Sequence, residues 1–114
     1  RSRGLGDVYK RQVLTMLVKE SEANKEELVE AIRNKDRMRI KEIIHRMFPM
    51  WEMLGIAEEL QEYRNLVHDD SSGDQIMKEW TLKITASLDR LVSAAENEIY
   101  SLIRQENEKE NTDS

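Results

Sequence analysis

The sequence contains no cysteine, one proline, four glycines and one phenylalanine, and only 5% of its 114 residues are aromatic. The missing cysteines exclude a disulfide framework, a thiolate metal site and a cysteine nucleophile. Few residues break helices, and runs of β-branched residues are scarce. This composition favours helices over sheets.

The sequence also lacks a long apolar run and a surplus of basic residues. No stretch approaches the roughly 20 apolar residues that span a bilayer, and no secretory signal is visible. The net charge is -5, and no basic stripe dominates any expected helix, which argues against a nucleic-acid partner. We therefore expect a cytoplasmic domain without membrane contact. The abrupt start without Met favours a fragment of a longer chain.

Helical periodicity of the apolar residues organises the chain into segments. Turn or cap signals separate the segments at Asn34–Asp36, at Gly55 and at the polar loop 69–74. Short connections imply antiparallel neighbours, so the prediction is an all-α, up-and-down bundle of four helices. Asn24 followed by Glu27 resembles a capping box, so the segment before Asn34 is either one long bent helix or an extra short N-terminal helix followed by a second helix.

The two ends of the chain differ from the part between them. Residues 1–12 are basic and contain two glycines. We interpret them as a junction or artificial segment, with a functional basic arm as the alternative. Residues 106–114 contain no apolar residue and are predicted to be disordered. The bundle should therefore occupy residues 13–105.

The segment 36–55 carries the main candidate for chemistry. At about 100° per residue, its apolar residues lie within an arc of about 100°, and His45 lies about 150° from the middle of that arc. His45 should therefore face solvent. The apolar residues are Ile40, Ile43, Ile44, Met47, Trp51 and Leu54.

Several kinds of site are poorly supported. His45 has no second histidine at helical spacing, and His68 lies on another element, which argues against a metal site. The acidic loop after His68 lacks the glycine position and closing glutamate of a calcium loop. No nucleophile elbow or phosphate-binding loop is present. An autonomous enzyme is therefore not expected, and a nucleophilic histidine acting on a partner remains.

The segment 36–55 resembles the histidine-containing phosphotransfer (HPt) domains of multistep two-component relays. These domains show an Asp opening the helix, an exposed His nine residues later and a Gly ten residues beyond, and Asp36, His45 and Gly55 match this spacing. The run from His45 to Trp51 looks like the variant at the C-terminal ends of Bacteroidetes-type hybrid sensor kinases. The resemblance covers roughly residues 13–103.

The resemblance implies a phosphocarrier rather than an enzyme. His45 would accept a phosphoryl group from a receiver-domain aspartate and pass it to another receiver. Partners would be response-regulator receiver domains and a hybrid sensor kinase. The receiver would supply Mg²⁺, and this domain would have no cofactor or metal of its own. We expect a monomer, because the apolar stripes can be satisfied within one bundle.

The neighbours of His45 depart from the family pattern. Many members have a Lys three residues after the His, where Phe48 stands here. Lys41, about 40° from His45 on the helical wheel, is the best substitute to neutralise the phosphoryl group, and Arg46 is the second candidate. The residues expected to dock the partner are Met38, Phe48, Pro49, Glu52 and Gly55.

Pro49 also removes the backbone donor that would bond the carbonyl oxygen of His45, so we expect a kink or a loosened turn.

Three alternatives remain open. The chain could be a degenerate HPt-like module that docks receivers without carrying phosphate, because the Lys is missing. It could be an unrelated helical interaction module in which His45 is incidental. If the chain is a phosphocarrier, His68 is the alternative phosphoacceptor.

Overall fold

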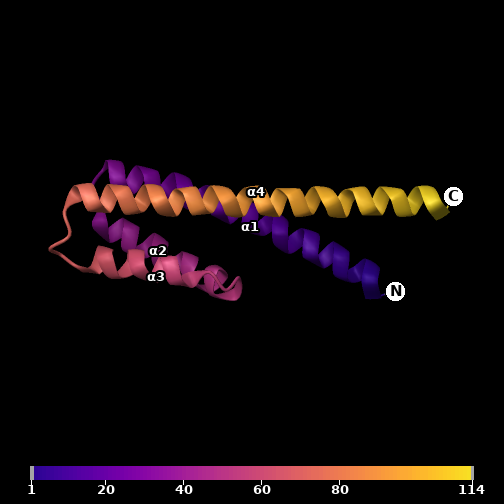
Figure 1. Cartoon of the computed structure of the whole chain (residues 1–114), viewed down its shortest axis with the longest axis horizontal. Helices are drawn as coiled ribbons and strands as arrows, with labels where there is room; N and C mark the ends of the chain where they lie inside the picture. The colour runs from indigo at the N-terminus through magenta and orange to yellow at the C-terminus, as the bar shows by residue number, and fades with distance from the viewer. Residues whose placement is uncertain (1, 114) are drawn as a thin grey trace.

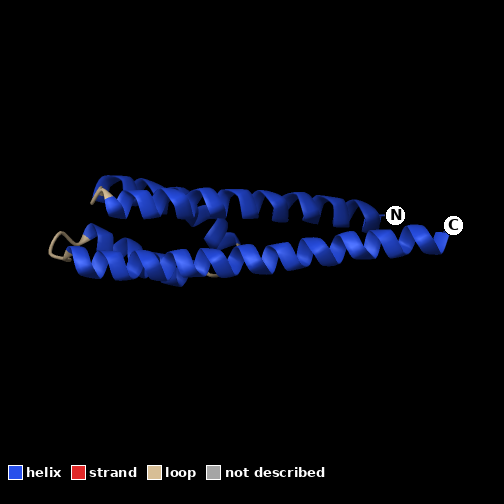
Figure 2. Ribbon diagram, turned by 90° about the horizontal axis from the view of Figure 1, so that it is seen from above, coloured by secondary structure: helices blue, strands red, loops and turns tan. Residues whose placement is uncertain are grey.

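The computed structural model describes residues 2–113, and it describes side chains over residues 6–108. The protein is all-α, and the described residues contain no strand (Figure 2). The four helices are α1 (Ser2–Arg33), α2 (Arg37–Met53), α3 (Ala57–His68) and α4 (Asp74–Asp113). No helix in the described part of the chain is both long and apolar enough to cross a membrane.

The helices differ in length, and this gives the molecule its elongated shape of 64 × 21 × 16 Å. Helix α1 packs against α2 and α4, and α3 packs against the same two helices. Figure 1 shows both termini at one end of the molecule and the α1–α2 and α3–α4 connections at the other end. The long helices α1 and α4 extend past the shorter α2 and α3, so one half contains four helices and the other half two.

Helix α1 is a single helix from Ser2 to Arg33, so of the two alternatives for this segment the single helix is confirmed and the extra short N-terminal helix is wrong. Asn24 is buried, and its Oδ1 accepts hydrogen bonds from the guanidinium of Arg46 on α2, at 2.9 Å from Nη2. Glu27 also accepts from Arg46, at 2.8 Å. The two polar residues therefore bind a neighbouring helix, and neither is needed to cap a new one.

The helical structure also reaches further at both ends than the sequence suggests. No helix break marks the expected boundary at residue 13, and whether residues 1–12 are a junction segment stays a prediction. The disorder predicted for residues 106–114 differs from the structure, in which α4 continues to Asp113; Ser114 lies outside the described residues. Helix α4 contains no Gly or Pro to stop its propagation. Arg11 pairs with Glu106 at 2.6 Å and joins the two long helices.

The turn between α1 and α2 closes on a residue with a left-handed backbone. Lys35 has φ +54°, and the amide of Asp36 donates to the carbonyl of Ala31 at 2.8 Å. This conformation imposes steric strain on a non-glycine residue. The carboxylate of Asp36 then accepts from the amide of Arg39 at 3.1 Å, so the predicted N-cap is confirmed.

The turn between α2 and α3 depends on the predicted glycine. Helix α2 ends at Met53, and Gly55 has φ +74°. The amide of Gly55 donates to Glu52 and that of Ile56 donates to Trp51, both at 3.0 Å. This paired pattern is the Schellman motif, which confirms Gly55 as the C-terminal cap.

The core lies in the four-helix half and contains two large aromatic side chains, Trp51 and Tyr63. The buried face of α4 begins at Met77, whereas the preceding Ile76 is 46% exposed. Trp80 is partly buried against the core, and the Lys83 ammonium lies 4.3 Å from its ring centre. Residues buried at or below 1% exposure are Ser21, Leu28, Ile40, Ile43, Ile44, Met47, Leu60, Tyr63, Val67, Thr81, Ile84 and Leu88.

The buried face of α4 includes a polar side chain, Thr81, that meets a polar group on α3. The phenol oxygen of Tyr63 lies 2.6 Å from Oγ1 of Thr81, and both residues are fully buried. The hydroxyl of Thr81 donates its hydrogen to the carbonyl of Met77 at 2.7 Å, so the phenol of Tyr63 is the donor in the pair. Burial raises the pKa of Tyr63 to about 12.

Candidate functional site

His45 lies near the middle of α2 and is exposed, as the helical wheel predicts. Its neighbours Ile44 and Met47 are buried at 1% exposure, so the helix that carries it is fixed to the core. Within residues 6–108, the imidazole makes no hydrogen bond or ion pair. The ring is therefore open to a partner while its backbone is held firmly.

We define the His45 surface as His45 together with Met38, Lys41, Phe48, Pro49, Glu52 and Arg64. Met38 is 73% exposed, and Pro49 and Glu52 are also exposed. Gly55, predicted to contact the partner, is exposed and serves as the helix cap described above. The surface thus combines an exposed imidazole, exposed apolar groups and charges of both signs.

Pro49 lies inside α2, and the helix continues through it to Met53. A proline has no amide hydrogen, so it cannot donate to the carbonyl oxygen of His45. That carbonyl oxygen is left available to water or to a partner beside the imidazole. The proline therefore alters the backbone at His45 without ending the helix.

Arg46, one of the two cations proposed for the phosphoryl group, is engaged elsewhere. Its guanidinium donates to Asn24 and Glu27, as described above. Glu27 also binds Arg39, so one carboxylate of α1 pairs with two arginines of α2. Arg46 therefore joins α1 to α2, and it shares the negative charge of Glu27 with Arg39.

Lys41, the other proposed cation, is partly buried and makes no hydrogen bond or ion pair with the described side chains. It precedes His45 by one helical turn, so both side chains project from the same side of α2. Its ammonium remains available to an anion at His45.

Arg64 of α3 is a cation that the sequence pattern did not reveal. Its guanidinium carbon lies 5.2 Å from the centre of the Phe48 ring, within the range of a cation–π contact. Phe48 is partly buried and packs against the core. Arg64 is exposed and makes no ion pair with any described residue. The only indication in the sequence was the short α2–α3 connection, which places α3 beside α2 and so allows α3 to supply a cation near Phe48.

His68, the alternative phosphoacceptor, is the last residue of α3 and is exposed. It lines a shallow surface depression of about 460 Å³ with Arg64 and Asp69. The hydroxyl and the backbone amide of Ser71 both donate to the Asp69 carboxylate, at 2.7 and 3.0 Å, and lower the pKa of Asp69. His68 lies at a helix end beside a loop, whereas His45 lies on a core helix.

The described residues hold no group of three or more His, Asp or Glu side chains able to bind a metal ion. What the His45 surface can offer chemically is an exposed imidazole nucleophile, a nearby ammonium and a stacked guanidinium. Comparison of the chain with known protein families, curated proteins and solved structures found no match.

Proposed function

We propose that this chain is an HPt-type phosphocarrier built as an antiparallel up-and-down four-helix bundle. The observation that carries the proposal is the exposed imidazole of His45 on a helix whose opposite face forms the core. The spacing of Asp36, His45 and Gly55 supports the same function, because the first and third of these cap α2. This domain would act in the cytoplasm, as a monomer, between two receiver domains.

In the proposed reaction a neutral imidazole nitrogen of His45 attacks the phosphorus of a receiver phospho-aspartate. An N–P bond forms, the P–O bond to the aspartate breaks, and the carboxylate leaves with the bonding electrons. The second transfer reverses these steps on another receiver. Such transfer needs positioning and charge neutralisation more than covalent help. The receiver would supply Mg²⁺, and this chain would need no cofactor of its own.

The charge around the phosphoryl group would come from two helices of this chain. Lys41 approaches from the preceding turn of α2, and Arg64 reaches over Phe48 from α3. We assign Arg64 the role that a lysine at the position of Phe48 has in many HPt domains. Met38, Pro49 and Glu52 would contact the receiver around the nucleophile.

A transfer assay tests the proposal directly. The protein is mixed with a receiver carrying radiolabelled phospho-aspartate, and label on the protein is followed by gel electrophoresis. We expect label that is stable in alkali and lost in acid, and that is absent from His45→Ala. The matched variant His68→Ala should label like the wild type. Label that persists in His45→Ala and disappears in His68→Ala would contradict the assignment.

A degenerate receiver-docking module is the second candidate. It is favoured by Phe48 in place of the family lysine and by the engagement of Arg46 with Glu27. In that case the receiver would bind, as measured by calorimetry, and no label would transfer. An absence of both binding and label would instead support an unrelated interaction module.

A further inference from the structure

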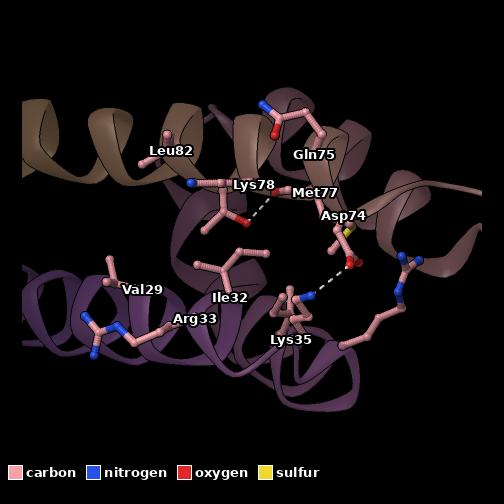
Figure 3. A pocket seen from close by; sticks show the side chains of 12 residues that line it. Val29, Ile32, Arg33, Lys35, Asp74, Gln75, Met77, Lys78 and Leu82 are labelled. Atoms are coloured by element: carbon pink, nitrogen blue, oxygen red, sulfur yellow. Dashed lines mark hydrogen bonds and ion pairs between the residues drawn. The ribbon is translucent and has the colours of Figure 1, made fainter.

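A second candidate site lies at the end of the molecule where α1 meets the starts of α2 and α4. It is a cavity of about 510 Å³, and it shares no residue with the His45 surface. Figure 3 shows Val29, Ile32 and Arg33 of α1 on one side of the cavity, with Leu82 and Gln75 of α4 on the other. Small-molecule sites in proteins have volumes of about 300–1,000 Å³, so the cavity is large enough for one.

The wall of the cavity is mainly apolar. Val29 and Ile32 of α1 are partly buried, and Met77 of α4, which also lines the cavity, is 3% exposed. Leu82 also lines the cavity, although it is 57% exposed and faces no helix that would cover it. Contact with a hydrocarbon group would remove these apolar side chains from water, which is favourable in free energy.

The mouth of the cavity is basic although the chain carries a net charge of -5. Four basic side chains line it, against one carboxylate, Asp74. Arg37 is engaged with the backbone carbonyls of Val67, Asp69 and Ser72, and Lys35 lies 3.6 Å from Asp74, as the dashed line in Figure 3 marks.

The two remaining cations of this mouth, Arg33 and Lys78, make no hydrogen bond or ion pair with the described side chains. Both are exposed, and they project from different helices, α1 and α4. Two uncompensated positive charges beside an apolar wall are complementary to a molecule with an anionic head and an apolar body.

From this combination we propose that the cavity binds a free amphipathic anion, a carboxylate on an unbranched hydrocarbon chain. The hydrocarbon chain covers Val29, Ile32 and Leu82, and the carboxylate lies between Arg33 and Lys78. The proposal is independent of phosphotransfer, because no residue of the His45 surface takes part.

A titration of the whole chain with dodecanoate, kept below its micellar concentration, tests the proposal by amide NMR. We expect saturable shifts concentrated at Val29, Lys78 and Leu82. The double variant Arg33→Glu with Lys78→Glu should weaken binding at least tenfold. Arg104→Glu is the matched control, since Arg104 is an exposed cation of α4 remote from the cavity, and it should bind like the wild type. Circular dichroism of each variant verifies that the helices are intact.

Two additional probes test the charge of the ligand and its source. Dodecyltrimethylammonium has the same hydrocarbon chain and the opposite charge, and equal binding of this probe at the cavity would overturn the anionic selectivity. Vesicles of phosphatidylglycerol test a membrane source of the same chemistry. Vesicle binding without binding of monomeric dodecanoate would overturn the proposal. The proposal would also be overturned if Arg104→Glu lost as much affinity for dodecanoate as the double variant, or if the wild type showed no saturable shifts.

Discussion

The guanidinium carbon of Arg64 lies 5.2 Å from the centre of the Phe48 ring, so an arginine of α3 is held over the side chain that follows His45 by one helical turn. The Phe48 ring belongs to α2 and the Arg64 guanidinium to α3, and the contact limits the conformational freedom of both side chains. The contact keeps a positive charge near the position where HPt domains often carry a lysine. This relationship leads to the first prediction.

Replacing Arg64 by Ala should slow transfer of the phosphoryl group to His45 by about tenfold, a loss of about 1.4 kcal/mol in transition-state stabilisation. The physical reason is that one cation near the transferred group is lost. The measurement is the rate of label transfer from a phosphorylated receiver. Adding Phe48→Lys to Arg64→Ala should restore most of the rate, because it returns a cation to the neighbouring turn. Unchanged transfer in Arg64→Ala would leave Lys41 as the neutralising group.

Replacing Arg46 by Ala should affect stability and leave transfer nearly unchanged. The variant loses the contacts with Asn24 and Glu27, and Asn24 is then left buried with an unmatched oxygen. We expect a loss of about 1–2 kcal/mol in the free energy of unfolding. Urea denaturation measures it, and Arg104→Ala, at a cation without a described partner, is the control. A tenfold slower transfer with unchanged stability would restore Arg46 as a phosphoryl-neutralising residue.

Replacing Lys35 by Gly should stabilise the protein by about 0.5–1 kcal/mol. A non-glycine residue in a left-handed backbone conformation costs free energy, and glycine removes this cost. The gain exceeds the free-energy cost of the extra conformational entropy that glycine loses on folding. The ion pair with Asp74 adds little, since its side chains are 74% and 72% exposed. Thermal unfolding measures the change. Lys35→Ala removes the same ion pair and keeps the Cβ, so it should give no gain. Stabilisation in both variants would mean that the charge, and not the backbone, is responsible.

The raised pKa of Tyr63 predicts a specific loss of stability in alkali. Below pH 10 the phenol is protonated in both states and its contribution is fully present. As the pH rises toward 12 the unfolded chain loses this proton first, and stability falls by up to about 1.4 kcal/mol per pH unit. Tyr63→Phe should reduce this fall in urea denaturation between pH 9 and pH 11. It should also lower stability at pH 7 by about 1 kcal/mol, through loss of the bond with Thr81. Tyr100→Phe, at an exposed ring, should leave the fall unchanged.

Features that depend on neighbours along the chain were predictable from the sequence. The helical character, the exposure of His45, the N-cap at Asp36 and the glycine cap at Gly55 follow from periodicity and capping chemistry within a few residues. The same local rules left open whether Asn24 with Glu27 begins a new helix, because a capping pair and a pair of acceptors for an arginine look identical in sequence. Helix α4 continues through residues 106–113, which contain no apolar residue, since the length of a helix depends on the absence of stop signals as well as on apolar residues.

Sequence alone therefore determined that the chain is helical and that one helix presents a histidine outward, because turn-by-turn geometry decides both. Contacts between residues remote in sequence decided the rest. The partner of the buried Thr81 hydroxyl is the Tyr63 phenol of α3, and the role of Arg46 follows from Glu27 lying within 2.8 Å. The position of Arg64 over Phe48 depends on how α3 packs against α2. Only the tertiary structure selects among the many partners that a charged side chain could have.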